Sequence, residues 1–343
     1  MRFCSSALFR VAKQFIHDHP RVSIVVIKIE DLSKSFGNVG AVNKVSFDVA
    51  EQETLVLLGT SGCGKTTLLK MINRLIEPTS GTIQINGENV LNKNAAELRR
   101  GIGYVLQNTG LFPHYTVAEN IALVPQLLKW DKKQTENRTH ELLEKLHLDK
   151  NVLSAYANEL SGGQQQRVGL ARALAVDPPV LLMDEPFGAL DTITRSKIQT
   201  EFKELDELKR KTIIMVTHDV QEAFELGDRI CLMDKGSIVQ LGSTADLLFK
   251  PANKFTLDFL KEQRLLLEFK TVKPPQPPAG GVFELDGVIL PSDANLWFLM
   301  DQLKFASADN ISILDNDRNK IGKLGYEELI GLFHQHKKTH GHE

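Results

Sequence analysis

The chain has 343 residues, of which 42% are hydrophobic and 24% charged, and its formal net charge is −2. This composition is typical of a globular protein with one large and one smaller domain, and the charge argues against nucleic acid as a partner. The three cysteines (Cys4, Cys63 and Cys231) lie far apart, which favours reduced thiols in a cytosol, and no apolar run is long enough to span a membrane. Any role at a membrane therefore requires a partner protein.

Residues 1–24 are predicted to be a disordered N-terminal extension, and we expect the folded domain to begin at residue 25. The segment carries several Arg and Lys residues against a single acid, and it has no long apolar core. A targeting peptide is an alternative interpretation, although a secretory signal would need such a core.

Two alternating segments precede the most informative stretch of the chain. Val22–Glu30 and Val45–Val49 alternate between apolar and polar residues, which predicts strands, and Lys34–Gly37 is expected to be a turn. Phe36 lies at that turn. Its ring could stack on an adenine, or it could be a half-buried residue at a strand end.

A glycine-rich loop follows the apolar segment Thr54–Leu58. The loop residues are Gly59, Thr60, Ser61, Gly62, Cys63, Gly64, Lys65 and Thr66, and Thr67 opens an apolar helix. This is the phosphate-binding pattern of a nucleoside triphosphate site, and its strand-to-helix context disfavours a plain turn. Lys65 is expected to reach the β- and γ-phosphates, and the Thr66 hydroxyl is expected to bind Mg²⁺.

The next strand patterns enclose a helical insertion. Gly81–Gly87 alternates and ends in an Asn-Gly turn, and Ile102–Gln107 predicts a buried strand. The pattern over 108–178 is helical, with the leucines of Glu141–Leu148 on one broad face. We therefore expect a helical subdomain inserted between two halves of an α/β core.

Polar residues end the apolar strands on both sides of this insertion. Asp184 and Glu185 follow one apolar run, His218 follows another, and Gln107 ends the strand before the insertion. Apolar strands that alternate with helices predict a parallel sheet, and ligands bind at the carboxyl ends of such strands. These four side chains are therefore expected to converge on the glycine-rich loop.

The same side chains have the chemistry of nucleotide hydrolysis. Asp184 is expected to hold Mg²⁺, and Glu185 to polarise the attacking water, although such a carboxylate pair could also cap a helix. Gln107 could bind the metal or the water, and His218 could contact the γ-phosphate. A structural role is the alternative for each of these two residues.

The segment Leu160–Gln164 resembles a second helix start suited to phosphate. It contains Ser161, Gly162, Gly163 and Gln164. Ser161 suits an N-cap, and the glycines permit the close approach of an anion. A second such site in one chain is explained if it closes on a nucleotide held by another subunit.

Proline and glycine mark a linker at 266–281, between an ATPase domain at 25–265 and the C-terminal part. Strand and helix patterns continue over 282–336, and a His-rich tail occupies 337–343. The sequence therefore predicts one large domain followed by a small α/β region.

Two metal-like patterns near the C-terminus are not expected to bind metal. Asp315, Asp317 and Asn319 begin like a calcium loop, but Lys320 and Tyr326 stand where Gly and Glu are needed. The histidines at the end of the chain are interpreted as part of a solvated tail.

Taken in chain order, these motifs resemble those of the ATP-binding-cassette (ABC) transporter ATPases, over roughly Ile27–Leu260. The matching segments are Gly59–Thr66, Gln107, Leu160–Gln164, Val180–Pro186, Ala189–Asp191 and His218. The resemblance implies a phosphate-loop α/β cassette with a mainly parallel sheet, an antiparallel β subdomain and the helical subdomain. It also implies a homodimer that sandwiches two ATP molecules, each between one phosphate loop and the opposite Ser161–Gln164 signature. Phe36 would then stack on adenine, where Tyr or Trp is common, and Asp191 would join the nucleotide site.

A closer resemblance is to the importers of quaternary amines and proline, and Gly110–His114, Ile121–Trp130 and Pro186–Arg195 carry it. Thr192 stands where Pro is common. The resemblance implies an ATPase subunit that uses ATP and Mg²⁺ at the cytoplasmic face of the inner membrane, as a peripheral protein. It would energise uptake of glycine betaine, carnitine or choline through membrane permease subunits and, indirectly, a solute-binding protein. The alternatives are an importer of another small solute such as an amino acid or polyamine, an exporter, or a soluble cassette ATPase.

Two further expectations accompany this resemblance. Part of Gln107–Trp130 is predicted to form a groove for a permease helix, or else to pack the subdomain's own core. Its apolar residues are Leu111, Phe112, Tyr115 and Val117. The segment Ile311–Leu324 resembles the end of a CBS repeat, and a single repeat would need a partner from a second subunit.

Overall fold

The computed structural model describes residues 24–107, 109–188 and 190–340. The extension expected at 1–24 lies outside the described residues except for Ile24, and so do Ala189 of the Ala189–Asp191 motif and the end of the His-rich tail. Strands of the described chain form a four-stranded, a six-stranded and a second four-stranded sheet. The fold class expected from the sequence is confirmed by these sheets.

The first four-stranded sheet is antiparallel and has the strand order β2-β1-β4-β5. Its strands are β1 (Val25–Phe36), β2 (Val39–Ala50), β4 (Ser80–Ile85) and β5 (Glu88–Asn89). The turn expected at Lys34–Gly37 is wrong, because β1 continues through Phe36, which pairs with Val39 of β2. Only Gly37 and Asn38 form the hairpin turn, and Gly37 supplies the positive φ of 56° that a tight two-residue loop needs.

The six-stranded sheet has the order β10-β9-β3-β8-β7-β6. Its strands are β3 (Thr54–Gly59), β6 (Ile102–Val105), β7 (Val180–Asp184), β8 (Thr212–Thr217), β9 (Arg229–Asp234) and β10 (Ser237–Ser243). All neighbouring pairs are parallel except β9 with β10. The carboxyl ends of β3, β6, β7 and β8 therefore point to one edge.

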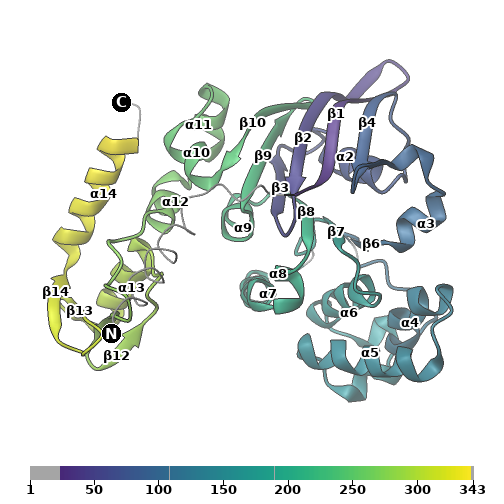
Figure 1. Cartoon of the computed structure of the whole chain (residues 1–343). Coiled ribbons are helices and arrows are strands. Elements are labelled where there is room, and N and C mark those ends of the chain that lie inside the picture. Colours follow the sequence, from purple (N-terminus) through teal and green to yellow (C-terminus); the bar gives the residue numbers. More distant parts are fainter. Residues whose placement is uncertain (1–23, 108, 189, 341–343) are drawn as a thin grey trace, which may run out of the picture.

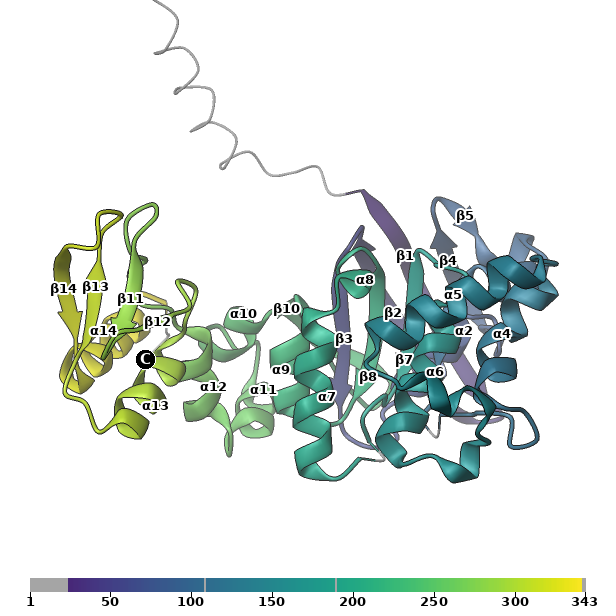
Figure 2. The same cartoon turned by 90° about the horizontal axis from the view of Figure 1, so that it is seen from below.

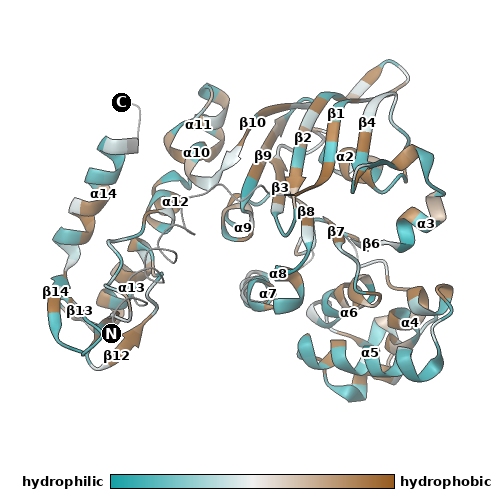
Figure 3. Ribbon diagram, viewed as in Figure 1, coloured by the Kyte–Doolittle hydropathy of each residue, from teal (hydrophilic) through white to brown (hydrophobic). Residues whose placement is uncertain are grey.

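The central sheet is buried on both faces. In β3, Leu55 and Leu57 join the core that includes Leu68 and the antiparallel sheet, whereas Val56 and Leu58 join the core on the other face. Because successive side chains alternate between two apolar environments, the strand has no polar position to break the run. In Figure 3 the brown, hydrophobic colour accordingly runs along the strands of this sheet, while α5 is largely teal.

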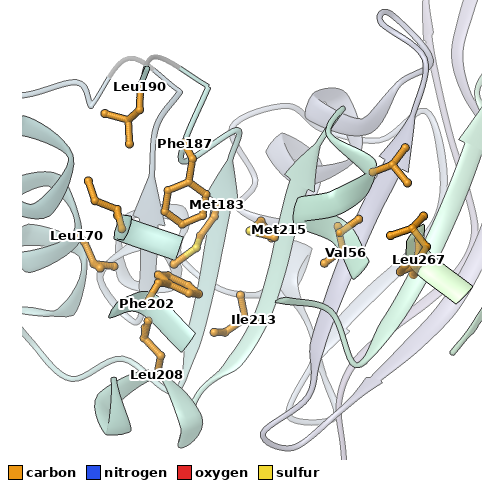
Figure 4. Packing of buried hydrophobic residues seen from close by; sticks show 14 of the residues in the cluster. Val56, Leu170, Met183, Phe187, Leu190, Phe202, Leu208, Ile213, Met215 and Leu267 are labelled. Carbon is orange, nitrogen blue, oxygen red and sulfur yellow. The ribbon is translucent and has the colours of Figure 1, made fainter. Parts of the chain in front are cut away.

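Helices cover this sheet. They are α2 (Lys65–Ile72), α3 (Ala95–Arg100), α7 (Thr192–Glu204), α8 (Asp206–Lys209) and α9 (Val220–Leu226), with a short 3-10 turn at Val90–Asn92. Figure 4 shows the core on one face, to which Met183 and Met215 of the strands and Leu170 and Phe202 of the helices contribute. The Phe187 and Phe202 rings meet edge to face, with centroids 5.5 Å apart. Each such buried side chain contributes about 1.5–3 kcal/mol, so this packing fixes α7 on the sheet.

The helical subdomain inserted between β6 and β7 comprises α4 (Val117–Leu127), α5 (Lys132–Lys145) and α6 (Gly162–Leu174), with 3-10 turns at Lys150–Ser154 and Ala157–Glu159. Thr116 begins α4 with a capping box to Glu119. The leucine face predicted for Glu141–Leu148 is confirmed, since all four leucines are buried.

The C-terminal part begins with α10 (Thr244–Phe249), α11 (Lys254–Leu260) and α12 (Arg264–Thr271). The predicted start of the linker at residue 266 is wrong, because the helix α12 continues through Thr271 and buries Leu267 and Glu268. A Glu268 carboxylate that accepts from Arg264 at 2.7 Å and pairs with Lys337 at 3.2 Å holds this helix in place.

The last sheet has the order β12-β11-β13-β14 and is antiparallel. It consists of β11 (Val282–Leu285), β12 (Val288–Leu290), β13 (Ile311–Leu314) and β14 (Lys320–Leu324), with α13 (Leu296–Ala306) and α14 (Tyr326–His340). In both Figure 1 and Figure 2 this sheet lies at the opposite end of the molecule from α4 and α5. Among the described helices, none has the length and apolar character that crossing a membrane requires.

Candidate nucleotide-binding and catalytic site

The glycine-rich loop connects β3 to α2, and its backbone leaves no room for larger residues at two positions. Gly59 has a φ of 151°, and a Cβ there would lie 2.2 Å from the Met233 carbonyl oxygen. Gly64 has a φ of 104°, and a Cβ there would lie 2.3 Å from the Ala41 carbonyl oxygen. Both positions therefore require glycine for conformational and steric reasons.

The loop wraps around the ammonium group of Lys65. This side chain is buried, and its Nζ donates to the carbonyl oxygens of Gly59 at 2.8 Å and Thr60 at 2.9 Å. The helix α2 begins at Lys65 with no side-chain cap on its first amides. An uncapped helix N-terminus beside a buried cation is suited to an anion, and a nucleotide phosphate fits this arrangement.

A cavity of about 300 Å³ opens over the loop. Its lining consists of Ala41, Ser61, Gly62, Cys63, Gly64, Lys65, Thr66, Thr67, Gln107 and Glu185. A larger hollow of about 470 Å³ lies between α4 and α5, but none of the predicted site residues lines it. The smaller cavity is therefore the one in which phosphate chemistry is possible.

The hydroxyl of Thr66 and the carboxylate of Asp184 meet at the edge of this cavity. Thr66 Oγ1 donates to Asp184 Oδ1 at 2.8 Å, and Asp184 is only 4% exposed. Burial raises the pKa of Asp184, while the Thr66 hydrogen bond and the positive charge of Lys70 oppose that shift. Two adjacent oxygen atoms, one from a buried carboxylate, are the donor type that Mg²⁺ prefers, so the residues fit this metal.

Three of the predicted catalytic side chains meet at one oxygen atom. Glu185 Oε2 accepts from Gln107 Nε2 at 2.8 Å and lies 3.3 Å from His218 Nδ1. The three residues follow β6, β7 and β8, so the parallel sheet brings them to one edge as expected.

The backbone of Glu185 is strained. Its φ is +47°, and a left-handed conformation in a residue other than glycine costs about 1–3 kcal/mol. Two backbone hydrogen bonds hold it there: its amide donates to Val216 at 2.9 Å, and its carbonyl accepts from Gly188 at 3.1 Å. Such strain is typical of functional sites, and here it orients the Glu185 carboxylate toward the cavity lining.

The Ser161–Gln164 segment and Asp191 are not part of the cavity lining. Ser161 is the N-cap of α6, and its hydroxyl accepts from the backbone amide of Gln164 at 3.3 Å. In return, the side-chain oxygen of Gln164 accepts from the backbone amide of Ser161. A Cβ on Gly162 would lie 3.7 Å from Leu190, and one on Gly163 would lie 3.1 Å from Thr194. The segment therefore packs beside Leu190 and Thr194 and does not line the cavity over its own phosphate loop.

Phe36 is also absent from the cavity lining. Its side chain is 51% exposed at the end of β1, and the Lys34 ammonium lies 5.1 Å from its ring centroid. An exposed ring of this kind can stack on a planar ligand. In the described part of the chain, however, Phe36 does not line the cavity with the other predicted site residues.

Sequence reasoning missed several residues around the site. Thr60 Oγ1 donates to Asp234 Oδ1 at 3.3 Å, and Ala41 closes the loop from β2. Arg195 lies 3.5 Å from Asp219, the residue after His218, and Glu222 is buried on the helix that Asp219 begins. The sequence offers one signal for Glu222. It lies one turn after the N-cap residue Asp219 and next to the apolar Ala223, on a short helix whose apolar face packs on the sheet.

Comparisons with known proteins place these features in context. The family model described as ABC transporter matches residues 42–188. The glycine betaine/carnitine/choline transport ATP-binding protein OpuCA of Bacillus subtilis (strain 168) is 52% identical over 242 residues, which is 70% of this chain and 64% of OpuCA. The choline transport ATP-binding protein OpuBA of the same organism is 44% identical over 303 residues, which is 88% of this chain and 79% of OpuBA.

A solved structure extends the comparison to the fold. The ATP-binding cassette MJ0796, in a dimeric post-hydrolysis state bound to ADP and Pi, is 35% identical and superimposes with a TM-score of 0.57. The superposition covers 63% of this chain and 98% of that one. The part of this chain outside the superposition is therefore additional to a complete cassette.

Proposed function

Because this chain belongs to the ABC transporter family as one of its ATP-binding ATPase subunits, we propose that it energises an importer of a quaternary-amine osmoprotectant. The solute would be glycine betaine, carnitine or choline. The observation that carries the proposal is that Lys65 and Glu185 line one cavity, with Asp184 hydrogen-bonded to Thr66 of the same lining. The relatives of the chain are named for transport of these solutes. An importer for an amino acid or polyamine is the second candidate, because the ATPase site itself contacts no solute.

In this proposal the nucleotide phosphates lie over Gly59–Thr66 and the first amides of α2. Lys65 moves its ammonium from the loop carbonyls toward the β- and γ-phosphates, exchanging two neutral acceptors for charged ones. Thr66, Asp184 and Gln107 are the residues that would hold Mg²⁺. Bound Mg²⁺ would offset the negative charge of the phosphates.

Glu185 would orient and polarise the water that attacks the γ-phosphate. In the structure its Oε2 is already engaged by Gln107 and His218, so one of these contacts must open before the oxygen can accept from water. His218 is the side chain that would turn, because its contact with Glu185 is the longer of the two, 3.3 Å against 2.8 Å, and it would then contact the γ-phosphate. Activation of the water through Oε2 therefore requires a rearrangement of the site.

We further propose that the active form is a homodimer. The Ser161–Gln164 helix start and Asp191 are not part of the lining of their own cavity, and in this proposal they contact a nucleotide on a second copy of the chain. MJ0796, a cassette 35% identical to this chain, is dimeric in its nucleotide-bound structure. Phe36 would stack on the adenine of its own subunit.

The surface after Gln107 is proposed to receive a short cytoplasmic helix of the permease. Phe112 is 46% and Tyr115 41% exposed, and their ring centroids lie 5.4 Å apart. Val117 is buried and Leu111 is half-buried against the core, so these two residues pack inside the subdomain and are not part of the exposed surface. An exposed aromatic pair beside Gln107 suits a helix-in-groove contact that responds to the nucleotide.

A cysteine crosslink tests this surface. A Phe112→Cys variant of the assembled transporter should crosslink to an engineered cysteine in a cytoplasmic permease loop, and ATP should change the yield. A Phe305→Cys variant is the matched control, because Phe305 is 89% exposed but lies in the C-terminal α/β region. Equal yields from both variants, or none from Phe112→Cys in a transporting complex, would place the coupling surface elsewhere.

The C-terminal region consists of two strands and a helix followed by two more strands and a helix, and we propose that it acts as one CBS-like repeat. Lys270 of α12 pairs with Glu225 of α9, the helix that follows His218. We propose that the region pairs with its copy in a second subunit and modulates hydrolysis through α12.

Co-purification tests the transporter assignment. The full chain, purified from membranes with mild detergent, should bring down an integral membrane permease, as a peripheral subunit on the cytoplasmic face would, with a solute-binding protein joining through the permease. Capture of ribosomes or DNA in place of a permease would support a soluble cassette ATPase.

A further inference from the structure

Arg195 connects the turn after Glu185 to the helix after His218. From α7 its Nη2 donates to the Leu190 carbonyl at 2.9 Å, and its Nη1 lies 3.5 Å from Asp219 Oδ2. Asp219 is the N-cap of α9, with its other oxygen accepting from the amides of Gln221 and Glu222. A single side chain thus spans from the Leu190–Asp191 segment to the residue next to His218.

Glu222 lies behind this contact on the first turn of α9. It is 4% exposed, and its Oε1 atom has no hydrogen-bond partner among the described residues. The same is true of Arg195 Nε. Leaving a buried donor or acceptor without a partner costs about 1–3 kcal/mol, so a complementary pair of unsatisfied atoms is an unstable arrangement.

Groups on several neighbouring elements shift the pKa of Glu222. Burial raises the pKa of Glu222 to about 8, a hydrogen bond from Thr217 at the end of β8 lowers it, and Asp219 of α9 raises it. The positive charge of Arg195 on α7 lowers this pKa, and the negative charge of Glu185 after β7 raises it. Arg195 and Glu222 are therefore within electrostatic reach of each other, while Arg195 is engaged by Asp219.

We propose that Arg195 and Glu222 are positioning residues that couple the Leu190–Asp191 segment to His218. A small shift of α7 against α9, as the Asp191 segment meets a second subunit, moves the guanidinium from Asp219 to Glu222 and satisfies both unpartnered atoms. Asp219 is then released from Arg195, and the turn that carries His218 is free to move off Glu185. This proposal rests on the proposed function, because it supplies the link between dimer closure and the catalytic site.

The test compares ATP hydrolysis by full-length variants. Glu222→Ala and Arg195→Ala should each lower kcat about tenfold or more while the KM for ATP changes less than about twofold, since neither residue lines the nucleotide cavity. The double variant should be no slower than the slower single variant, because both changes remove the same contact. Gln221→Ala, at the position before Glu222 on α9, is the control and should keep wild-type kcat.

A pH profile separates positioning from a structural role. Ionised Glu222 favours the proposed contact, so the kcat of the wild type should rise as the pH approaches 8, whereas Glu222→Gln should lack this limb. Glu222→Gln has the same shape as the native residue, and its unfolding midpoint shows whether it folds.

Three results would overturn the proposal. They are a Glu222→Ala kcat within about twofold of wild type, multiplicative losses in the double variant, or the same pH limb in Glu222→Gln. Glu185→Gln is measured in the same series. Absence of hydrolysis by the wild type would overturn the proposed function and this proposal with it, whereas normal hydrolysis that Glu185→Gln abolishes and Glu222→Ala leaves intact overturns this proposal alone.

Discussion

Replacing Glu222 by Gln should stabilise the protein, and the gain should grow with pH. The pKa of this carboxyl rises from 4.5 to about 8 on folding, with burial as the main cause. Between these two values the unfolded chain releases the proton while the folded chain keeps it, so ionisation stabilises the unfolded state. The free energy of unfolding of the wild type therefore falls as pH rises from about 4.5 and levels off above about 8.

The size of the effect follows from the same values. Each unit of pKa difference corresponds to about 1.4 kcal/mol. At pH 7 the ionisation of Glu222 in the unfolded chain therefore lowers the free energy of unfolding by about 3 kcal/mol. Glutamine cannot ionise, and its amide occupies nearly the same volume. The advantage of Glu222→Gln over wild type should therefore increase by about 3 kcal/mol between pH 4.5 and pH 7.

Chemical denaturation at a series of pH values measures this difference directly. Glu225→Gln serves as the control, because Glu225 is on the same helix but is 39% exposed and paired with Lys270. Its difference from wild type should stay nearly constant over the same range. A constant difference for Glu222→Gln as well would show that Glu222 is ionised in the folded protein, and the burial argument would be refuted.

Three other substitutions address the nucleotide site. Glu185→Gln should leave ATP binding intact and slow hydrolysis by a factor of about 10²–10⁴, because it removes the group that polarises water; unchanged turnover would contradict that role. Lys65→Ala should weaken ATP binding about tenfold to a hundredfold, as expected for lost charge-assisted hydrogen bonds, and normal binding in a filter or calorimetric assay would disprove the loop assignment. Asp184→Asn keeps the shape of the side chain but not its charge, so the Mg²⁺ concentration for half-maximal hydrolysis should rise about tenfold, and an unchanged Mg²⁺ requirement would exclude Asp184 as a ligand.

Much of the cassette could be predicted because its signals are local. The apolar run of β3, the glycine-rich loop and the start of α2 form one continuous segment, and each part requires the next. The carboxyl ends of parallel strands meet at one edge, so the convergence of Gln107, Glu185 and His218 follows from strand assignment alone.

What could not be predicted depends on pairing between distant segments. Lys34–Phe36 has the composition of a turn, but the register between Phe36 and Val39 extends β1 through it. Thr271 ends a helix just before a Pro-rich stretch, because the apolar face of α12 packs onto the core. The burial of Glu222 likewise depends on packing between elements far apart in the sequence, which no local pattern records.

ATP-driven uptake by the reconstituted transporter tests the central claim most directly. The chain is purified with its permease and reconstituted into vesicles. The solute-binding protein is supplied on the face of the membrane opposite this chain. We predict that ATP supplied on the side of this chain drives accumulation of labelled glycine betaine, carnitine or choline with the wild type and not with Glu185→Gln. Failure to accumulate any of these amines, in vesicles where labelled amino acids or polyamines enter in an ATP-dependent way, would contradict the account.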